Sequence, residues 1–224
     1  MYRFIKPFLL LFYLQFLFGI GGLGIYYNQD FFSTEAFETG ETITVTSGEL
    51  ENASGPGIFL YLDVIPFVDI QIDIENSNSS YNFSTSGTLE GTLKLSRLSQ
   101  YYTVRKKIIG FSIPLLAKAQ LYSGAGFNVH IVTPKVDDDF ITDAFDKPIE
   151  EAVLLEFSSS NKDLLIDYLK ENKNKYNGFH LMVGAQAKLM SATLFANLRY
   201  TIAKDVIPGK NGFPSMWIGI GLGI

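Results

Sequence analysis

Alternating apolar and polar positions mark residues 57–75 as β structure. Period two places alternate side chains on opposite faces of a strand. The apolar set is Leu60, Leu62, Val64, Pro66, Val68, Ile70, Ile72 and Ile74. Because Pro66 cannot donate a hydrogen bond to a sheet, we predict a tight turn at residues 65–67 that folds the stretch into a hairpin. The core of a soluble barrel or the lipid-facing side of a membrane barrel would accommodate such an apolar face.

The same alternation predicts six further strands. They cover residues 16–27, 102–112, 116–131, 178–189, 192–202 and 213–224. A bulge at Gly21 and Gly22 would bring both phases of the first strand onto one face. Two more tight turns are expected at residues 113–115 and 190–191. Together with the hairpin, the pattern predicts eight strands.

The links between these strands alternate between short and long. Residues 28–56, 76–101 and 132–177 are polar and are predicted to be long loops, and residues 203–212 form a loop of intermediate length. Residues 42–46 are a candidate short strand extension. In the longest loop, residues 159–173 are predicted to form a helix, which Asn161 would cap. Its apolar stripe consists of Leu164, Leu165, Tyr168 and Leu169.

These patterns favour a membrane barrel over a soluble one. Short turns at one end and long loops at the other, with an even number of strands, are typical of outer-membrane barrels. Eight strands with large apolar side chains facing inward would overfill the narrow interior of a soluble barrel. A soluble lipocalin-like barrel and an anchored β-sandwich are the alternatives. We therefore predict an all-β, eight-stranded, antiparallel, up-and-down transmembrane barrel with long extracellular loops, one of which contains a short helix.

The N-terminus resembles an export signal. Arg3 and Lys6 precede an apolar run over residues 8–18, although no Ala-x-Ala-like cleavage site follows. An uncleaved helical anchor and a misplaced start codon are the other interpretations. We expect residues 1–15 to be an export signal or N-terminal segment, and residues 16–224 to be the barrel domain.

Composition narrows the function classes. The chain has no cysteine, so disulfides and thiolate sites are excluded, and its net charge of −5 argues against nucleic-acid binding. The 224 residues are 47% hydrophobic, with a mean hydropathy of +0.16, which is high for an ordinary soluble β domain. The 19 Phe and 12 Tyr residues suit aromatic girdles at the membrane interfaces.

The pattern over residues 16–224 resembles the small eight-stranded outer-membrane barrels, the OmpA/OmpX/OmpW-like group. The last strand carries Met216, Ile218, Ile220, Leu222 and Ile224 on one face and ends the chain, similar to the signal that the barrel-assembly machinery recognises, although an aromatic last residue is usual there. The resemblance implies the outer membrane of a Gram-negative-type bacterium. It implies outer-membrane lipid and lipopolysaccharide as surroundings and the assembly machinery as a partner during biogenesis.

Charged residues on the polar faces predict a network of ion pairs in the lumen. The acids lie on the hairpin and the bases on later strands. The predicted members are Asp63, Asp69, Asp73, Glu75, Lys106, Lys118, Lys188 and Arg199. Because an unpaired buried charge is costly, we expect these groups to pair and plug the barrel. A gated path for small ions is the functional alternative.

His130 and His180 are predicted at the rim near the long loops. They are weak candidates for a metal site completed by Asp137, Asp138 or Asp139, whose spacing does not match an EF-hand loop. The phase places no serine beside either histidine, so we expect no enzyme activity and no cofactor.

Three functions follow from these patterns. The first is a structural or surface-interaction role through the long loops, for which the surface ligand is unknown. The second is a narrow channel or transporter for ions or for small or apolar solutes, as the OmpW-like resemblance suggests. A lipid-modifying outer-membrane enzyme is a lesser alternative.

Overall fold

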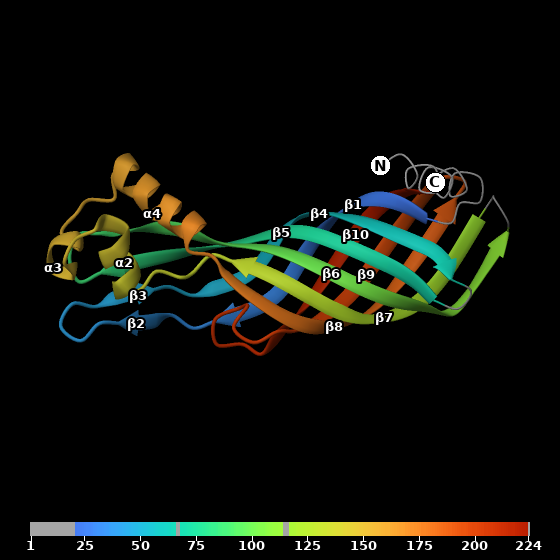
Figure 1. Ribbon diagram of the computed structural model, residues 1–224, viewed down its shortest axis with the longest axis horizontal. Helices are drawn as coiled ribbons and strands as arrows, with labels where there is room; N and C mark the ends of the chain where they lie inside the picture. The colour runs from blue at the N-terminus through green and yellow to red at the C-terminus, as the bar shows by residue number, and fades with distance from the viewer. Residues whose placement is uncertain (1–20, 66–67, 114–116, 224) are drawn as a thin grey trace, which may run out of the picture.

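The protein folds into one barrel with a head at one end (Figure 1). The computed structural model describes residues 21–65, 68–113 and 117–223. The barrel strands are β1 (Gly21–Thr34), β4 (Leu50–Ile65), β5 (Val68–Thr85), β6 (Glu90–Ile113), β7 (Ala117–Val132), β8 (Asn174–Leu189), β9 (Ala192–Ile202) and β10 (Gly212–Gly223). The head adds β2 (Phe37–Thr39), β3 (Val45–Ser47), α2 (Asp138–Phe145), α3 (Ile149–Ala152) and α4 (Ser159–Glu171).

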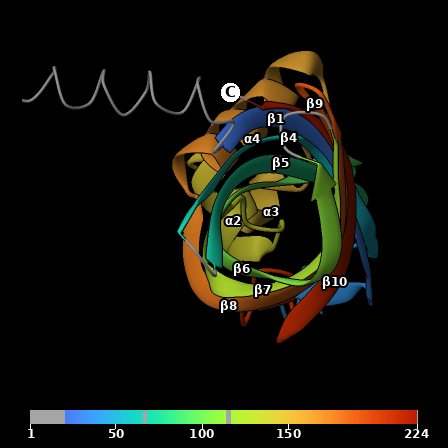
Figure 2. The ribbon, with the colours of Figure 1, turned by 90° about the vertical axis from the view of Figure 1, so that its right-hand side faces the viewer.

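All neighbouring barrel strands are antiparallel, and the sheet closes on itself. β1 pairs with both β4 and β10, and the β5–β6 pairing completes the ring, which Figure 2 shows in a view along the barrel. The shear of the barrel is found by tracing paired residues once around the ring. The path starts at Leu222 on β10 and ends at Gly212 on the same strand, a shift of ten residues; it passes through Leu23, Leu60, Ile72, Tyr102, Phe127, Phe179 and Ile202. A shear of this size tilts the strands by about 35–45°. The predicted eight-stranded antiparallel barrel is confirmed.

Apolar side chains form a band around the outside of the barrel. Exposed Leu, Ile, Val and aromatic residues lie on the outward phase of every barrel strand, among them Ile25, Ile58, Ile74, Val104, Leu121, Leu181, Leu198 and Ile218. Tyr102, Phe127 and Phe179 are neighbours on β6, β7 and β8 in the half of the barrel nearer the head, and the Tyr102 and Phe127 rings stack at 4.7 Å. An outward apolar band with aromatic residues near its edge is the surface that a bilayer requires.

The inward phase is polar and aromatic. Gln71, Asp73 and Glu75 are almost fully buried, whereas Ile74 between them is exposed. The assignment of the two faces of the hairpin is therefore correct in the described part. Its turn at Pro66 and Phe67 lies outside the described residues, as do residues 114–116 of the second predicted turn, the start of the first strand and Ile224.

Two of the predicted long loops are largely strand, so those predictions were wrong. β5 continues to Thr85 and β6 begins at Glu90, so the two strands form one long hairpin. In the same way β1 continues to Thr34, and β4 begins at Leu50. Above the barrel this sheet has water on one side only. Its outer face can therefore be Ser, Asn and Thr, while Tyr81, Phe83, Leu93 and Leu95 point inward. The first-strand bulge lies between Asp30 and Ser33 rather than at Gly21 and Gly22.

The head has its own hydrophobic core. Residues of β3, β5 and β6 pack there against residues 136–171, the helical segment that contains α2, α3 and α4. The core includes Val45, Phe83, Leu93, Val136, Phe140, Ile141, Leu165 and Leu169. Figure 1 shows the helices gathered at the far end of the extended hairpin. None of the helices in the described part of the chain is long and apolar enough to cross a membrane.

The predicted helix at residues 159–173 corresponds to α4, with a different cap. Ser158, not Asn161, is the N-cap, and its Oγ accepts a hydrogen bond from the backbone N–H of Asn161 at 3.3 Å. Leu165 and Leu169 are buried, whereas Leu164 of the predicted stripe is 50% exposed. The helix therefore packs into the head by a narrower stripe than the sequence suggests.

Candidate functional site in the lumen and head

Aromatic side chains fill the lumen in the half nearer the short turns. The cluster consists of Tyr26, Phe59, Tyr61, Tyr122, Met182, Phe195 and Trp217. The ring centroids of Phe59 and Phe195 lie 4.8 Å apart, and those of Tyr26 and Trp217 lie 4.6 Å apart. Glycine at position 24 allows this packing, because a Cβ there would lie 2.3 Å from a ring carbon of Phe59. Side chains therefore occupy this part of the lumen.

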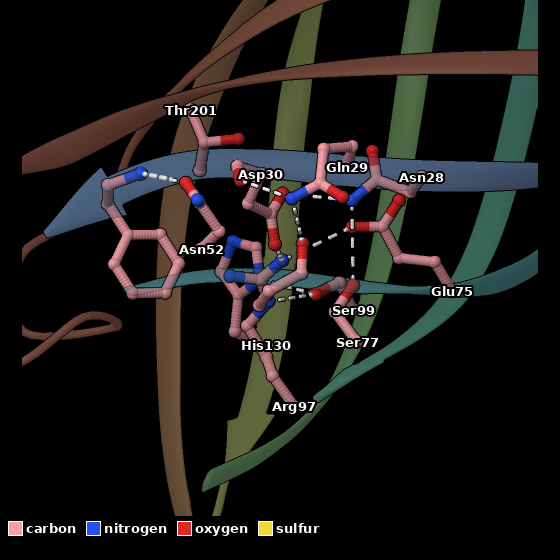
Figure 3. A network of polar contacts seen from close by, with 12 residues as sticks. Asn28, Gln29, Asp30, Asn52, Glu75, Ser77, Arg97, Ser99, His130 and Thr201 are labelled. Carbon is pink, nitrogen blue, oxygen red and sulfur yellow. Dashed lines mark hydrogen bonds and ion pairs between the residues drawn. The ribbon is translucent and has the colours of Figure 1, made fainter. Parts of the chain in front are cut away.

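An ionic network crosses the lumen between this cluster and the head (Figure 3). Arg97 Nη2 lies 2.6 Å from an Asp30 oxygen and 3.4 Å from Glu75 Oε1. Glu75 Oε2 lies 2.6 Å from Arg199 Nη2 and accepts a hydrogen bond from the Tyr26 hydroxyl at 3.0 Å. All five side chains are at most 5% exposed. Glu75 is the centre of the network, because it joins both guanidinium groups.

Stacked rings support the two guanidinium groups. The Arg199 guanidinium carbon lies 3.4 Å from the centroid of the Tyr101 ring, and that of Arg97 lies 4.5 Å from the centroid of Phe213. Arginine stacks on aromatic faces while its edge donates hydrogen bonds. The network is therefore held in place by packing as well as by charge.

A second ion pair lies nearer the short turns. Arg105 donates to Gln71 Oε1 at 2.8 Å and lies 3.8 Å from Asp69, which is 17% exposed. Gln71 in turn donates to Asp73 at 2.6 Å. The Arg105 guanidinium also lies over the Tyr122 ring, at 4.7 Å from its centroid. This pair contacts the aromatic cluster through Tyr122.

The predicted charge network is only partly the one that forms. Asp69, Asp73, Glu75 and Arg199 point inward. Lys106 is exposed on the outward phase next to Val104, so its placement in the lumen was wrong.

Two other predicted bases lie at the short-turn end. Lys118 and Lys188 are register partners that are half-buried there. The side chain of Asp63 lies outside the described part of the chain.

Sequence reasoning missed three inward charges: Asp30, Arg97 and Arg105. Each shares its phase with a tyrosine that the structure places inside the barrel: Asp30 follows Tyr26 by four residues, and Arg97 and Arg105 lie four residues to either side of Tyr101. Asp30 and Arg97 fell outside the predicted strand boundaries. Arg105 was missed because the base beside it, Lys106, was assigned to the lumen. Continuing the period-two pattern through the supposed loops would have identified Asp30 and Arg97.

The two histidines lie inside the barrel wall and not at an exposed rim, which corrects the prediction. His130 is 0% and His180 is 1% exposed. His130 Nδ1 lies 2.9 Å from Ser99 Oγ, and His180 Nε2 lies 2.9 Å from Thr103 Oγ1. The expectation that no serine lies beside a histidine was therefore also wrong.

Ser99, His130 and Asn128 form a hydrogen-bonded chain. Arg97 Nε donates to Ser99 Oγ at 2.9 Å, which directs the Ser99 hydroxyl hydrogen toward His130 Nδ1. His130 Nε2 then donates to Asn128 Oδ1 at 3.0 Å. A serine beside a histidine is the arrangement of a nucleophile and its base. Here all three side chains are at most 1% exposed, so no substrate reaches them in this conformation.

Nothing in the described part of the chain groups three or more potential metal ligands from His, Asp and Glu. Asp137 instead caps α2, where its carboxylate accepts a hydrogen bond from the Phe140 N–H at 2.8 Å. Burial raises the pKa of Asp137 above its usual value. The role of this acid is that of a helix cap.

Polar contacts fasten the helical segment to the sheet of the head. Ser47 Oγ donates to the carbonyl of Val136 at 2.7 Å, and Lys135 Nζ donates to the carbonyl of Gly48 at 2.8 Å. The Lys135 ammonium also lies 4.6 Å from the centroid of the Phe37 ring. Burial lowers the pKa of Lys135 to about 8. The head is therefore a packed unit and not a set of independent loops.

These features define the class. A closed antiparallel barrel of eight strands, apolar on its outside and filled on its inside, is a transmembrane β-barrel of the outer-membrane type.

The chain is similar in fold to known barrels of this class. No protein-family model and no curated protein sequence matches it. The outer membrane protein OprG from Pseudomonas aeruginosa aligns with a TM-score of 0.49 and 11% identity over 91% of this chain and 92% of that one. Ail of Yersinia pestis, solved in complex with the heparin analogue sucrose octasulfate, aligns with a TM-score of 0.40 and 11% identity over 90% of this chain and 96% of that one. A second Ail structure aligns with a TM-score of 0.33 and 13% identity over the same shares.

Proposed function

We propose that the protein is an integral outer-membrane barrel that does not conduct and that carries its head on the cell surface as an interaction module. One observation carries this proposal: the lumen is filled along its length, by the aromatic cluster, the ionic network and the core of the head. A narrow channel for ions or small solutes would need these side chains to move apart. Outer-membrane lipid and lipopolysaccharide are the surroundings that the apolar band fits.

The arrangement of the strand connections supports this orientation. Outer-membrane barrels place their short turns in the periplasm and their long connections outside the cell. The β8–β9 connection is a turn at Met190 and Ser191, whereas the helical segment and the β5–β6 hairpin lie at the opposite end. The head would therefore face the medium, where its folded surface can bind a partner.

Single-cysteine labelling tests the orientation cleanly, because the natural chain has no cysteine. We expect Ser160→Cys, an exposed position of α4, to react with a membrane-impermeant maleimide on intact cells. Ser191→Cys, in the β8–β9 turn, is the matched control and should react only after the outer membrane is permeabilised. Labelling of Ser191→Cys but not of Ser160→Cys on intact cells would refute the proposed orientation.

Planar-bilayer recording tests the closed lumen and therefore separates this function from transport. We expect no channel events from the refolded protein. A variant with residues 138–171 replaced by a short Gly-Ser linker should also stay closed, because the ionic network and aromatic cluster lie within the barrel. Discrete channel events from the wild-type protein would favour the transport alternative.

A further inference from the structure

At the short-turn end, β6 and β7 run past the neighbouring strand β5. The β5–β6 pairing ends at Asp69 opposite Arg105, whereas the β6–β7 pairing continues to Ile113 opposite Ala117. Within the described part of the chain, no strand pairs with residues 106–113 on the side where β5 lies. Figure 1 shows this green hairpin projecting beyond the ends of β4 and β5. β6 therefore has an open edge of eight residues, which we call the β6 edge.

The β6 edge is apolar and exposed. Ile108, Ile109, Phe111 and Ile113 are 64%, 66%, 63% and 51% exposed. Ile108 is the extra residue of a bulge between Lys107 and Ile109. Long, apolar edges of this kind invite pairing with another strand, and natural proteins usually cover or interrupt them.

The β6 edge does not belong in hydrocarbon. Every second residue of an open edge directs its backbone N–H and C=O away from the sheet. In the bilayer core these groups would have no partner, so lipid-exposed sheet edges do not occur there. The β6 edge therefore lies at or beyond the membrane interface on the short-turn side, where another chain can reach it.

The β6 edge begins with two exposed positive charges, at Lys106 and Lys107. The acid nearest to it on β5, Asp69, lies opposite Arg105 and 3.8 Å from its guanidinium group. The sequence of residues 106–121 contains no Asp or Glu. A strand that pairs here gains from acidic residues opposite the lysines, since opposite charges across strands stabilise a sheet and like charges destabilise it.

A second copy of the chain meets this requirement poorly. Antiparallel pairing of two β6 edges about Gly110 would set each Lys107 opposite Ile113 of the other copy and would bring no acid to either lysine. Registers centred nearer Lys107 bring the lysines of the two copies closer to each other. The charge pattern therefore favours a different chain that carries acids.

We propose that the β6 edge binds an extended segment of a partner protein by β-strand addition on the short-turn side of the membrane. Apolar residues at alternate positions of this segment cover Ile109, Phe111 and Ile113. Acidic residues of the segment lie opposite Lys106 and Lys107. In this mode backbone hydrogen bonds supply affinity, and the side chains along the edge supply specificity. The interaction is independent of the head, so it holds or fails separately from the proposed surface function.

Fluorescence polarisation with synthetic peptides tests this inference. The probe is a labelled peptide of alternating valine and threonine with two glutamates at one end, and the comparison peptide has two lysines in their place. The protein is held in phosphatidylcholine nanodiscs. We expect the glutamate peptide to bind saturably and more tightly than the lysine peptide. The difference should be about 2- to 30-fold, the combined effect of two exposed ion pairs.

A charge exchange supplies the matched variant. Lys106→Glu with Lys107→Glu should reverse the preference, so that the lysine peptide binds more tightly than the glutamate peptide. Lys94→Glu with Lys175→Glu, both exposed and near the head, changes the net charge equally and should leave the preference unchanged. Ile109→Asp with Phe111→Asp should abolish peptide binding. Because both side chains are exposed, these variants should keep the heat-modifiable gel mobility of a folded barrel.

Three outcomes would overturn the proposal. One is equal polarisation changes with empty nanodiscs, which would assign the signal to lipid. Another is no saturable binding of the glutamate peptide by folded protein. The third is a dimer, detected by cross-linking through Phe111→Cys, that the glutamate peptide does not dissociate, since a second copy would then occupy the β6 edge.

Discussion

Neutralising Glu75 should destabilise the barrel more than any other single loss of charge in the lumen. Glu75 contacts Arg199 at 2.6 Å and Arg97 at 3.4 Å and accepts a hydrogen bond from Tyr26 at 3.0 Å. In Glu75→Gln the shape is kept, but Arg199 loses its only carboxylate partner among the described ion pairs. Arg97 retains Asp30 at 2.6 Å. Arg199 would then be buried without a carboxylate in contact.

The expected loss is about 3–5 kcal/mol of unfolding free energy, the usual cost of breaking a buried ion pair by removing one partner. This corresponds to a change of roughly 10²- to 10⁴-fold in the equilibrium constant. Urea titration in lipid vesicles measures it through Trp217, the only tryptophan of the chain. Trp217 is a suitable probe because its ring centroid lies 4.6 Å from that of Tyr26, which hydrogen-bonds to Glu75.

Two controls show whether the reasoning is right. Asp69→Asn removes an acid that is 17% exposed and 3.8 Å from Arg105, which keeps its hydrogen bond to Gln71 Oε1 at 2.8 Å, so it should cost less than Glu75→Gln. Adding Arg199→Met to Glu75→Gln removes the stranded charge and should recover part of the loss. Equal unfolding midpoints for Glu75→Gln and Asp69→Asn, or a double variant no more stable than Glu75→Gln, would refute the role assigned to the network.

Two further predictions concern the head and can be followed with a fluorophore on Ser160→Cys. Burial lowers the pKa of Lys135 to about 8 from a usual value near 10.5, so the folded head loses the Lys135 proton at a lower pH than the unfolded chain does. Raising the pH from about 8 to about 10.5 should therefore stabilise the head. Lys135→Met should remove this pH dependence, and a wild-type head that loses stability over that range would contradict the reasoning. Ser158→Ala should destabilise the head by about 0.5–2 kcal/mol through loss of the α4 cap, whereas a larger effect from Asn161→Ala would restore the sequence-based choice of cap.

The barrel could be predicted from the sequence because one physical constraint acts along its whole length. Lipid outside and a polar or aromatic lumen inside impose period two on every strand, and stretches such as residues 57–75 show it without interruption. The strand boundaries failed where that constraint ends. Above the membrane the outward face of β5 meets water, so Asn76, Ser80 and Asn82 can occupy positions that carry Ile70 and Ile72 lower in the strand. A strand with two polar-looking faces resembles a loop.

The lumen was harder to predict than the fold. The inward phase of a strand identifies which side chains enter the lumen. Which of these side chains meet depends on their positions along the barrel axis, and in a tilted barrel the shear sets which residues face each other across the lumen. Arg97 reaches Asp30 and Glu75 from a strand position that sequence reasoning assigned to a loop. Ser99 meets His130 for the same reason. No spacing rule within one strand would have brought these residues together.

The ionic network has a consequence beyond stability, because it ties the register of the strands to the position of both ends. A slip of one residue in β5 would exchange Glu75 for Ile74 and turn the carboxylate toward lipid, where a charge is strongly disfavoured. The same slip would displace the β5–β6 hairpin, which carries the head. It would also change the number of β6 residues beyond Arg105 that have no paired strand. Weakening the network should therefore broaden the population of registers as well as lower stability. Heterogeneous amide exchange at both ends of β6 in Glu75→Gln, against a single pattern in Asp69→Asn, would reveal this, whereas one shared exchange pattern in the two variants would limit the network to a stabilising role.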